Sequence, residues 1–360
     1  MGARRWGEVK GNCTPGRIAT PDLHGAVGPS VRLAFMFDTI DIEAAAGRIQ
    51  GVVRTTPLLP LTFADPRFDL RGKMENRQET GSFKCRGAWN QISQLTEGER
   101  ARGVIATSSG NHGRALAWAA RRAGVKATIV MPADAYPNKI EACRELGAEV
   151  VLGADRQEAE ALCRERMEQG ALLIHPYDSE RTVAGAGTVG REIALEWPEV
   201  EVVLVPVGGG GLISGSSLAL RRALGSDLQI FGVEPKGAPS MSLGLEAGHP
   251  VPVPAITTDV QGLCPLASGE LNVNICKETL NGVFLMEDGP IFAAQKRLVE
   301  FGEIVEPAGA ATTSAVLGGA LPDALLWGRT AQNPLRVVVV VSGGNPAPDQ
   351  LAALTRKRSE

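Results

Sequence analysis

Residues 81–87, with the sequence GSFKCRG, place a lysine one step into a predicted helix that follows a glycine. The helix dipole presents positive potential at this end, which disfavours the ammonium form of Lys84 and lowers the pKa of its side chain. A neutral lysine amine is a nucleophile toward an aldehyde. Most lysines are ordinary surface residues, so this segment alone indicates little without the motifs that follow.

A second motif, TSSGNHG at residues 107–113, joins a predicted strand to a predicted helix. Successive backbone N–H groups at a helix N-terminus bind anions, and this loop suits a carboxylate. The alternative is a simple capped turn, since serine and asparagine are good N-cap residues.

Four consecutive glycines, residues 208–211, lie between an apolar strand and a predicted helix. Ordering such a run costs conformational entropy, which is expected where the backbone must closely approach a ligand, usually a phosphate. No Gly-Lys-Ser/Thr follows, and the run is not a GxGxxG motif at the first strand of the chain. The alternative is a flexible loop.

A serine, Ser342, follows the five valines at residues 337–341. A hydroxyl at the carboxyl end of a central parallel strand points into the cleft where such folds bind ligands. The alternative is a turn without a ligand.

The elements that must position these motifs alternate between helix and strand. This alternation predicts an α/β protein with parallel sheets that are covered by helices on both faces. Helices are predicted over residues 41–53, 83–95, 112–123, 138–146, 156–169, 187–196 and 212–223, and strands over 104–107, 127–130, 149–152, 171–174, 202–207, 229–233 and 337–341.

Composition excludes several classes of protein. The chain has 360 residues, 37 basic and 40 acidic side chains, and a net charge of -3, so it lacks the basic surplus of a nucleic-acid-binding protein. No apolar run approaches the roughly 18 residues that a membrane helix requires. The six cysteines form no CxxC pair, which argues against a zinc site or a disulfide framework and indicates a cytoplasmic protein.

The chain carries four motifs in this order: SFKxRGA, SSGNHG, GGGGL and SGGN. With them it resembles the pyridoxal-phosphate enzymes of the tryptophan-synthase β fold (fold type II), in the serine/threonine dehydratase and serine racemase group. The resemblance extends over roughly residues 40–346. Further matching segments are VMP (130–132), ELGAEV (145–150), HP (175–176), AGAGT (184–188) and EPAGA (306–310).

The resemblance implies a fold of two open, parallel-type sheet domains with pyridoxal 5'-phosphate in the cleft between them. We expect residues 36–102 and 179–360 to form the large, cofactor-binding domain and residues 103–178 to form the small one. Residues 1–35 have no apolar periodicity, so we expect a disordered and dispensable N-terminal extension.

The resemblance also implies a role for each matched residue. Lys84 would hold the cofactor as a Schiff base and later remove the α-proton of the substrate. Phe83 would flank the ring, Asn111 would bond its 3-oxygen, and Ser342 would face the pyridine nitrogen. Ser109 would lie on the face opposite Lys84. The phosphate would be cradled by Gly208, Gly209, Gly210, Gly211 and Leu212, and the substrate carboxylate would be held by Ser108, Ser109, Gly110, Asn111 and His112.

The Ser342 assignment favours elimination. A neutral hydroxyl does not keep the pyridine nitrogen protonated as a carboxylate would, so the ring is a weaker electron sink and prompt loss of a β-leaving group competes well. The implied activity is an ammonia-lyase (dehydratase) that converts a β-hydroxy amino acid, threonine or serine by default, to a 2-oxo acid and ammonia. The alternatives are a dehydratase for 3-hydroxyaspartate or phenylserine, a racemase with Lys84 and Ser109 as its two bases, and a non-enzymatic protein that binds the cofactor or an amino acid.

Two features depart from the family pattern. Where relatives have an acid, a carbonyl and a second acid for a divalent cation such as Mg²⁺ or Ca²⁺, this chain has Glu234, Ala238 and Ser240, and a hydroxyl is a weaker ligand than a carboxylate. Where relatives usually have a basic residue before TGSFK, this chain has Glu79, which argues against the nucleotide activation known in some relatives. For partners we expect a small amino-acid substrate and a second copy of the chain in a homodimer, with no nucleic acid and no membrane.

Overall fold

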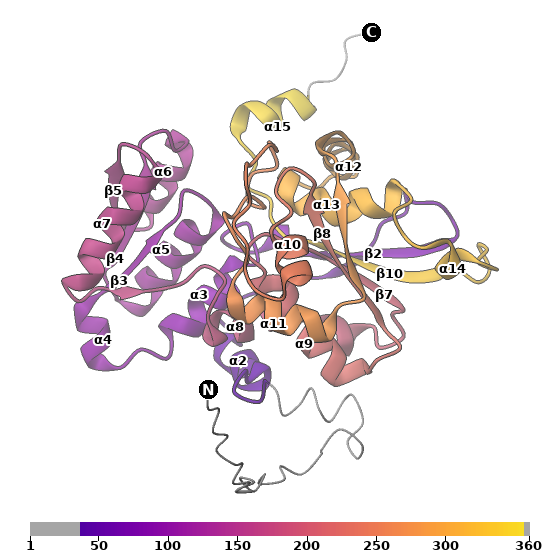
Figure 1. The fold of residues 1–360 in the computed structure, drawn as a ribbon, viewed down its shortest axis with the longest axis horizontal. Helices are drawn as coiled ribbons and strands as arrows, with labels where there is room; N and C mark the ends of the chain where they lie inside the picture. Colours follow the sequence, from indigo (N-terminus) through magenta and orange to yellow (C-terminus); the bar gives the residue numbers. More distant parts are fainter. Residues whose placement is uncertain (1–36, 356–360) are drawn as a thin grey trace, which may run out of the picture.

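The computed structural model describes residues 37–355, which form an α/β protein with two sheets (Figure 1). The predicted N-terminal extension, residues 1–35, lies outside the described residues. None of the helices between residues 37 and 355 has the length and apolar character needed to cross a lipid bilayer.

The larger sheet has six strands in the order β1-β2-β10-β7-β8-β9. Every neighbouring pair is parallel except β1 and β2, and the strand β10, which precedes Ser342, lies between β2 and β7. The valines of β10 are completely buried, as expected for a parallel strand covered on both faces. The strands are β1 (Leu58–Pro60), β2 (Phe68–Met74), β7 (Val202–Pro206), β8 (Gln229–Pro235), β9 (Gly282–Met286) and β10 (Leu335–Val341).

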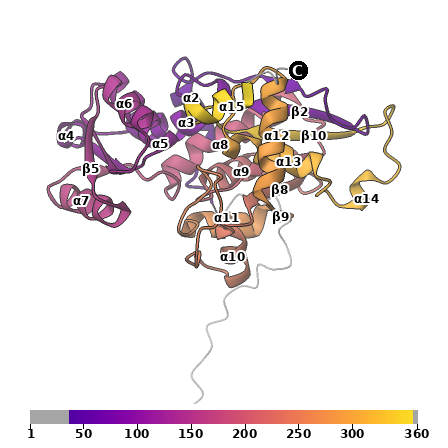
Figure 2. The same ribbon diagram turned by 90° about the horizontal axis from the view of Figure 1, so that it is seen from above.

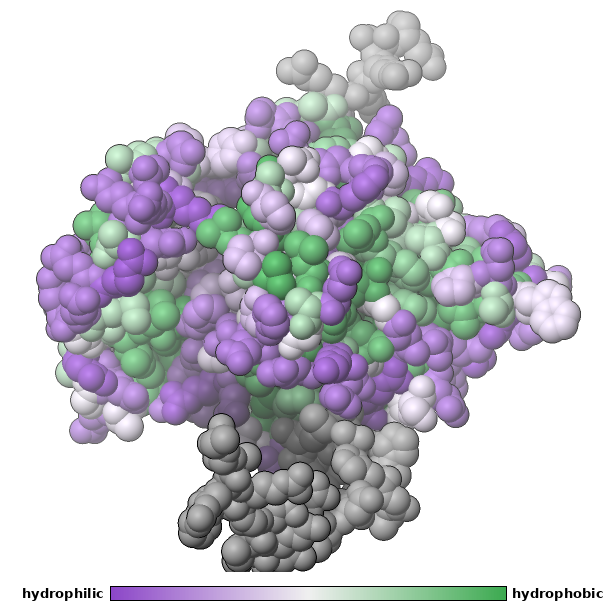
Figure 3. Space-filling model, viewed as in Figure 1, coloured by the Kyte–Doolittle hydropathy of each residue, from purple (hydrophilic) through white to green (hydrophobic). Residues whose placement is uncertain are grey.

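The smaller sheet has four parallel strands in the order β5-β4-β3-β6, all drawn from residues 104–173. In Figures 1 and 2 this sheet and its helices lie beside the larger sheet, and Figure 3 shows the surface recessed between the two. The strands are β3 (Val104–Thr107), β4 (Ala127–Pro132), β5 (Glu149–Gly153) and β6 (Leu172–Leu173), and the helices beside them are α4 (Glu97–Arg102), α5 (Asn111–Ala123), α6 (Pro137–Glu145) and α7 (Arg156–Glu168).

The remaining helices lie with the larger sheet, and one of them, α3 (Lys84–Ile92), also packs on α5 and contributes Cys85, Ala88 and Ile92 to the core of the smaller sheet. These helices are α2 (Ile42–Ile49), α3 (Lys84–Ile92), α8 (Glu180–Glu196), α9 (Gly211–Leu224), α10 (Ser240–Ala247), α11 (Glu270–Thr279), α12 (Asp288–Glu300), α13 (Pro307–Leu317), α14 (Asp323–Leu326) and α15 (Pro348–Thr355), with one 3-10 turn, η2 (Glu75–Arg77).

Helix α8 corrects the sequence prediction, which began this helix at residue 187. It begins at Glu180, where the Ser179 side chain accepts a hydrogen bond from the third residue of the helix. Glycine has a low helix propensity, but the early glycines of α8 pack closely against other helices. A Cβ at Gly185 would lie 2.7 Å from the Arg86 carbonyl oxygen in α3, and one at Gly187 would lie 2.9 Å from that of Gly215 in α9. The glycines are therefore contact points that join α3, α8 and α9.

Strands β1, β2 and β9 and helices α4 and α10 to α15 were not predicted. The sequence of β2, FDLRGKM, contains three charged residues, which hid a strand that lies inside the sheet. Its lysine, Lys73, is nevertheless fully buried, because its Nζ lies 2.6 Å from the Glu192 carboxylate and donates to the Thr56 carbonyl oxygen at 2.6 Å. Tertiary ion pairing has overridden the polarity of the segment.

Candidate active site

Lys84 is the first residue of helix α3, which begins one residue later than the predicted start at residue 83. The turn before it is fixed to the end of β10, because Phe83 N donates to Ser342 O at 3.1 Å and Ser82 forms an antiparallel bridge with Gly343. The Lys84 amine donates to Pro176 O at 2.8 Å and lies 5.0 Å from the centre of the Phe83 ring. Burial lowers the pKa of Lys84 to about 8, so roughly a fifth of the amine is neutral at about pH 7.4, far more than for an ordinary lysine.

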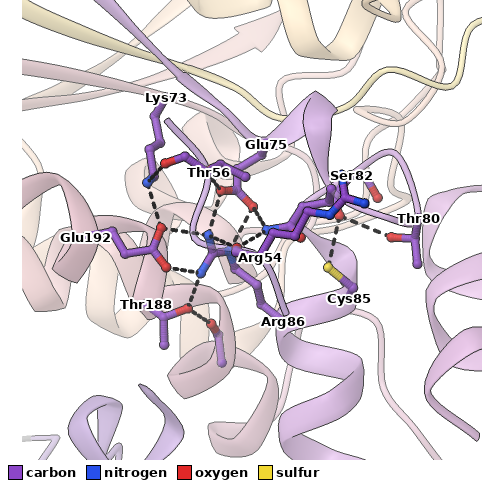
Figure 4. Close-up of polar contacts among 12 residues, drawn as sticks. Arg54, Thr56, Lys73, Glu75, Thr80, Ser82, Cys85, Arg86, Thr188 and Glu192 are labelled. Atoms are coloured by element: carbon purple, nitrogen blue, oxygen red, sulfur yellow. Dashed lines mark hydrogen bonds and ion pairs between the residues drawn. The ribbon is translucent and has the colours of Figure 1, made fainter. Parts of the chain in front are cut away.

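A buried ion network anchors α3 two residues beyond Lys84 (Figure 4). The fully buried Arg86 guanidinium pairs with Glu75 at 2.7 Å and with Glu192 at 2.6 Å, and Lys73 pairs with Glu192 from the other side. Burial alone would raise the pKa of Glu75, but the charge and hydrogen bond of Arg86, the charge of Lys73 and the Thr56 hydrogen bond together outweigh it, and the pKa is lowered. Removing one partner would leave a buried charge uncompensated, at a cost of about 3–5 kcal/mol. The network therefore fixes the helix that presents Lys84.

The glycine run forms a turn that leads directly into α9. Gly210 has φ +100°, a backbone conformation that side chains rarely adopt, and a Cβ at Gly209 would overlap the Tyr177 ring. Among residues 37–355, the structure gives no hydrogen-bond acceptor to the backbone amides of Gly208, Gly209 or Gly210. Three amide donors beside a helix N-terminus are the groups that a phosphate requires.

Asn111 is the first residue of α5 and lies in a chain of side-chain hydrogen bonds. Its Nδ2 donates to Glu306 Oε1 at 2.5 Å, and its Oδ1 accepts from Asn345 Nδ2 at 2.7 Å. Arg114 in turn donates to Asn345 Oδ1 at 2.6 Å. Burial raises the pKa of Glu306 to about 7, while the bond from Asn111 and the charge of Lys139 act in the opposite direction. Hydrogen bonds at both Nδ2 and Oδ1 therefore fix the orientation of the Asn111 amide.

The rest of the loop at residues 107–113 offers mainly backbone donors. The Ser108 hydroxyl accepts from the amides of Gly110 and Gly113, at 3.3 and 3.1 Å, and so caps the helix internally. The His112 ring bonds to Ile174 O at 2.8 Å, and burial lowers its pKa to about 3, which keeps it neutral. What His112 can offer a carboxylate is its backbone N–H. Ser109 is half-buried in the same loop.

Ser342 lies at the carboxyl end of β10 and is buried. Its hydroxyl has one long contact, 3.5 Å to Ala308 O, so it retains the capacity to bond to a ligand atom. Leu212, the other residue assigned to the cofactor, is buried in the first turn of α9.

The three residues considered for a cation lie together, but Glu234 is already satisfied. Its carboxylate accepts from Met241 N at 2.6 Å, Ser242 N at 3.0 Å and the Ser240 hydroxyl at 3.2 Å, at the start of α10. Burial raises its pKa, which further disfavours the charged form that a cation prefers. Between residues 37 and 355 there is also no cluster of three or more His, Cys, Asp or Glu side chains suited to a metal.

A pocket of about 430 Å³ opens beside Asn111 and Glu306. Lys139 of α6 donates to Gln261 Oε1 at 3.1 Å, and Gln261 Nε2 donates to the Tyr136 hydroxyl at 3.3 Å. Because a lysine only donates, this pairing determines which end of the Gln261 amide faces it. These side chains connect α6 to the loop before α11 at the rim of the pocket.

Taken together, the residues fit pyridoxal phosphate: a buried amine with a lowered pKa, free amides for a phosphate, an amide and a hydroxyl for the ring, and amides for a carboxylate. Sequence reasoning assigned no role to several residues that surround this set. Glu306 and Asn345 lie within the motifs EPAGA and SGGN, so the sequence marked both residues. Tyr177, Lys139 and Asn272 lie in no such motif, and nothing in the sequence marked them.

Comparison with known proteins supports the same conclusion. Residues 49–343 match the family model described as "Pyridoxal-phosphate dependent enzyme". The chain is 38% identical to an L-threonine ammonia-lyase of Thermotoga maritima (85% of this chain, 75% of the relative) and 35% identical to a phenylserine dehydratase of Ralstonia pickettii (78% and 87%). The solved structure of maize serine racemase is similar with a TM-score of 0.79 at 33% identity, covering 87% of this chain and 94% of the other.

The fold and the site define a fold-type II enzyme that depends on pyridoxal phosphate. The chain belongs to the pyridoxal-phosphate-dependent enzyme family, in the branch that contains carbon–nitrogen lyases and racemases.

Proposed function

We propose that this enzyme is an ammonia-lyase that converts a β-hydroxy amino acid, L-threonine or L-serine, to a 2-oxo acid and ammonia. The observation that carries this proposal is Ser342, an uncharged hydroxyl at the end of β10 next to the Lys84 turn. A hydroxyl there leaves the pyridine nitrogen unprotonated, which favours early departure of a β-substituent. The threonine ammonia-lyase relative supports the same substrate class.

The proposed residue roles follow from the contacts. When bound, pyridoxal phosphate supplies a sink for the electron pair left at the substrate Cα. Lys84 Nζ takes the α-proton, and the lowered pKa of about 8 makes that amine an available base. The amides of the loop at residues 107–113 hold the carboxylate, and those of residues 208–211 hold the phosphate. The β-hydroxyl leaves as water, so that the α-proton and the hydroxyl together make up the molecule of water lost, and the resulting enamine tautomerises and hydrolyses to the 2-oxo acid and ammonia.

A racemase is the second candidate. Ser109, half-buried beside the proposed carboxylate site, would act as the base on the face opposite Lys84, and maize serine racemase resembles this chain over most of its length. Dehydratases specific for phenylserine or 3-hydroxyaspartate remain alternatives within the lyase class. A protein that only binds the cofactor or an amino acid is the alternative outside enzymes.

The deciding experiment is a panel of β-hydroxy amino acids in both stereochemical series, assayed for 2-oxo acid, ammonia and the opposite enantiomer. We expect ammonia and 2-oxo acid from L-threonine or L-serine. Formation of the opposite enantiomer without ammonia would instead identify a racemase. Binding of the cofactor without either product would reject both enzymatic proposals.

We further propose two domains with the boundaries stated above, a homodimer, and a cytoplasmic location. The membership of the two sheets supports the boundaries, and the five cysteines in the described residues are all free, which suits a reducing compartment. Light scattering of the purified protein tests the dimer. The cation assigned to Glu234, Ala238 and Ser240 stays a prediction, which a chelator and Mg²⁺ or Ca²⁺ titration tests.

A further inference from the structure

Helix α11 contributes a completely buried amide, Asn272, which lies directly against the glycine run. Its Nδ2 donates to Gly209 O at 2.8 Å and to Tyr177 O at 3.1 Å. Its Oδ1 is buried without a partner among the described residues, so the amide is held by its two donated bonds alone. Burying the Asn272 oxygen without a partner costs stability. This cost indicates that the bonds donated by the Asn272 nitrogen have a specific role.

The bond to Gly209 fixes the orientation of one peptide group. Gly269 N also donates to Gly209 O, at 3.0 Å, so this carbonyl is held toward α11 by two donors. In a trans peptide the carbonyl and the following N–H point in opposite directions. The N–H of Gly210 is therefore turned away from α11, toward the side where the proposed phosphate would lie. Substitution of Gly210 is excluded sterically, because its Cβ would lie 2.6 Å from the Asn272 Cβ.

The bond to Tyr177 connects the glycine run to the turn that receives Lys84. Pro176 O, the acceptor of the Lys84 amine, lies in the residue before Tyr177. The next residue, Asp178, accepts from Glu270 N at 3.1 Å and from Leu271 N at 3.2 Å, so the turn is joined to the first turn of α11. The first turn of α11 is thus bonded both to the glycine run, where the phosphate would bind, and to the turn that accepts the Lys84 amine.

We propose that Asn272 is a positioning residue that sets the Gly209–Gly210 peptide for phosphate recognition and fixes it relative to the Lys84 turn. This inference rests on the proposed role of residues 208–211 as the phosphate cradle. It predicts that loss of the Asn272 donor weakens binding of the phosphate group more than binding of the rest of the cofactor.

The test compares pyridoxal phosphate with pyridoxal, which lacks the phosphate. The full-length chain is freed of cofactor, and both affinities are measured by spectroscopic titration for the wild type, Asn272→Asp and Asn272→Ala. Asn272→Asp keeps the shape but replaces a donor with an acceptor that faces two carbonyl oxygens. With two donated bonds lost, we expect the preference for pyridoxal phosphate over pyridoxal to fall about tenfold. Thermal stabilisation by inorganic phosphate should fall in parallel.

Two control variants on the same helix separate positioning from general destabilisation. Asn274→Asp makes the same chemical change at an exposed position, and Thr279→Val removes a buried hydrogen bond to Ser217 at the other end of α11. Both should retain the wild-type preference, even if Thr279→Val lowers the melting temperature.

The outcomes are distinguishable. If the wild type prefers pyridoxal phosphate and the Asn272 variants keep that preference, the inference about Asn272 is overturned. The same holds if Thr279→Val lowers the preference equally. If the wild type itself shows neither a preference nor protection by inorganic phosphate, the cradle assignment fails first. If Asn272→Asp does not fold, Asn272→Ala supplies the same comparison without the added charge.

Discussion

Replacing Glu306 with glutamine should remove a pH-dependent loss of stability that the wild type carries. Glu306 is buried, with 8% of its surface exposed, and burial raises the pKa of its carboxyl group to about 7 from 4.5. A glutamine carbonyl oxygen can accept the bond from Asn111 as the carboxylate does, but glutamine does not titrate. The substitution therefore isolates the charge of Glu306 from its hydrogen bond.

The sign and size of the effect follow from proton linkage. The folded chain binds the Glu306 proton more tightly than the unfolded chain, so the stabilisation is complete below pH 4.5 and is lost as the pH rises through 7. At about 1.4 kcal/mol for each pKa unit, titration of Glu306 should by itself remove about 3 kcal/mol of unfolding free energy from the wild type over this range. Glu306→Gln lacks this titrating group. Its unfolding free energy relative to that of the wild type should therefore rise by about 3 kcal/mol between pH 4.5 and 8.

The assay is denaturant unfolding of the full-length chain, freed of cofactor, at a series of pH values for both proteins. Glu300→Gln, at an exposed position on α12, is the matched control and should follow the wild type at every pH. A constant difference between Glu306→Gln and the wild type across the range would refute the reasoning, because it would mean that Glu306 does not change its charge there.

Four further outcomes are expected. Lys84→Ala should abolish turnover and the visible absorbance of bound cofactor, and cofactor that borohydride still traps on another lysine would contradict the assignment. The rate at which the wild type captures cofactor should rise with pH around a midpoint near 8, since only the neutral amine of Lys84 is a nucleophile; a flat profile would argue against a lowered pKa. Ser109→Ala should spare elimination from one enantiomer far more than racemisation, because removing a proton from one face needs one base; equal losses would make Ser109 a substrate-positioning residue. Gly185→Ala should destabilise the protein by about 1–3 kcal/mol, since the added methyl meets the α3 backbone, whereas Gly98→Ala in open space should not.

The sequence was informative about the motifs because each depends on local chemistry. A lysine at a helix start, a glycine run between strand and helix, and a hydroxyl after a buried strand are defined by neighbours in the chain. Lys84, the glycine run and Ser342 accordingly stand at the ends of α3, α9 and β10, where the alternation of helix and strand predicted them.

Other features could not be predicted because their cause is not local. Glycine has a low helix propensity, but the close contacts of the α8 glycines with α3 and α9 favour a helix there. The charged residues of β2 obscured a strand, because the group that compensates its buried Lys73, Glu192, is more than 100 residues away. No pattern in the sequence of α11 marked Asn272, since its task is defined by carbonyl groups of two other loops.

The sequence by itself therefore determined the α/β class and the groups that bear the chemistry, because helix starts, strand ends and turn residues carry their preferences with them. Only the tertiary structure decided how those groups are oriented: which carbonyl receives the Lys84 amine, which charges surround Arg86, and which amide holds the glycine run. The physical reason is that burial and long-range hydrogen bonds set side-chain orientation and proton affinity, and both arise only when distant segments pack together.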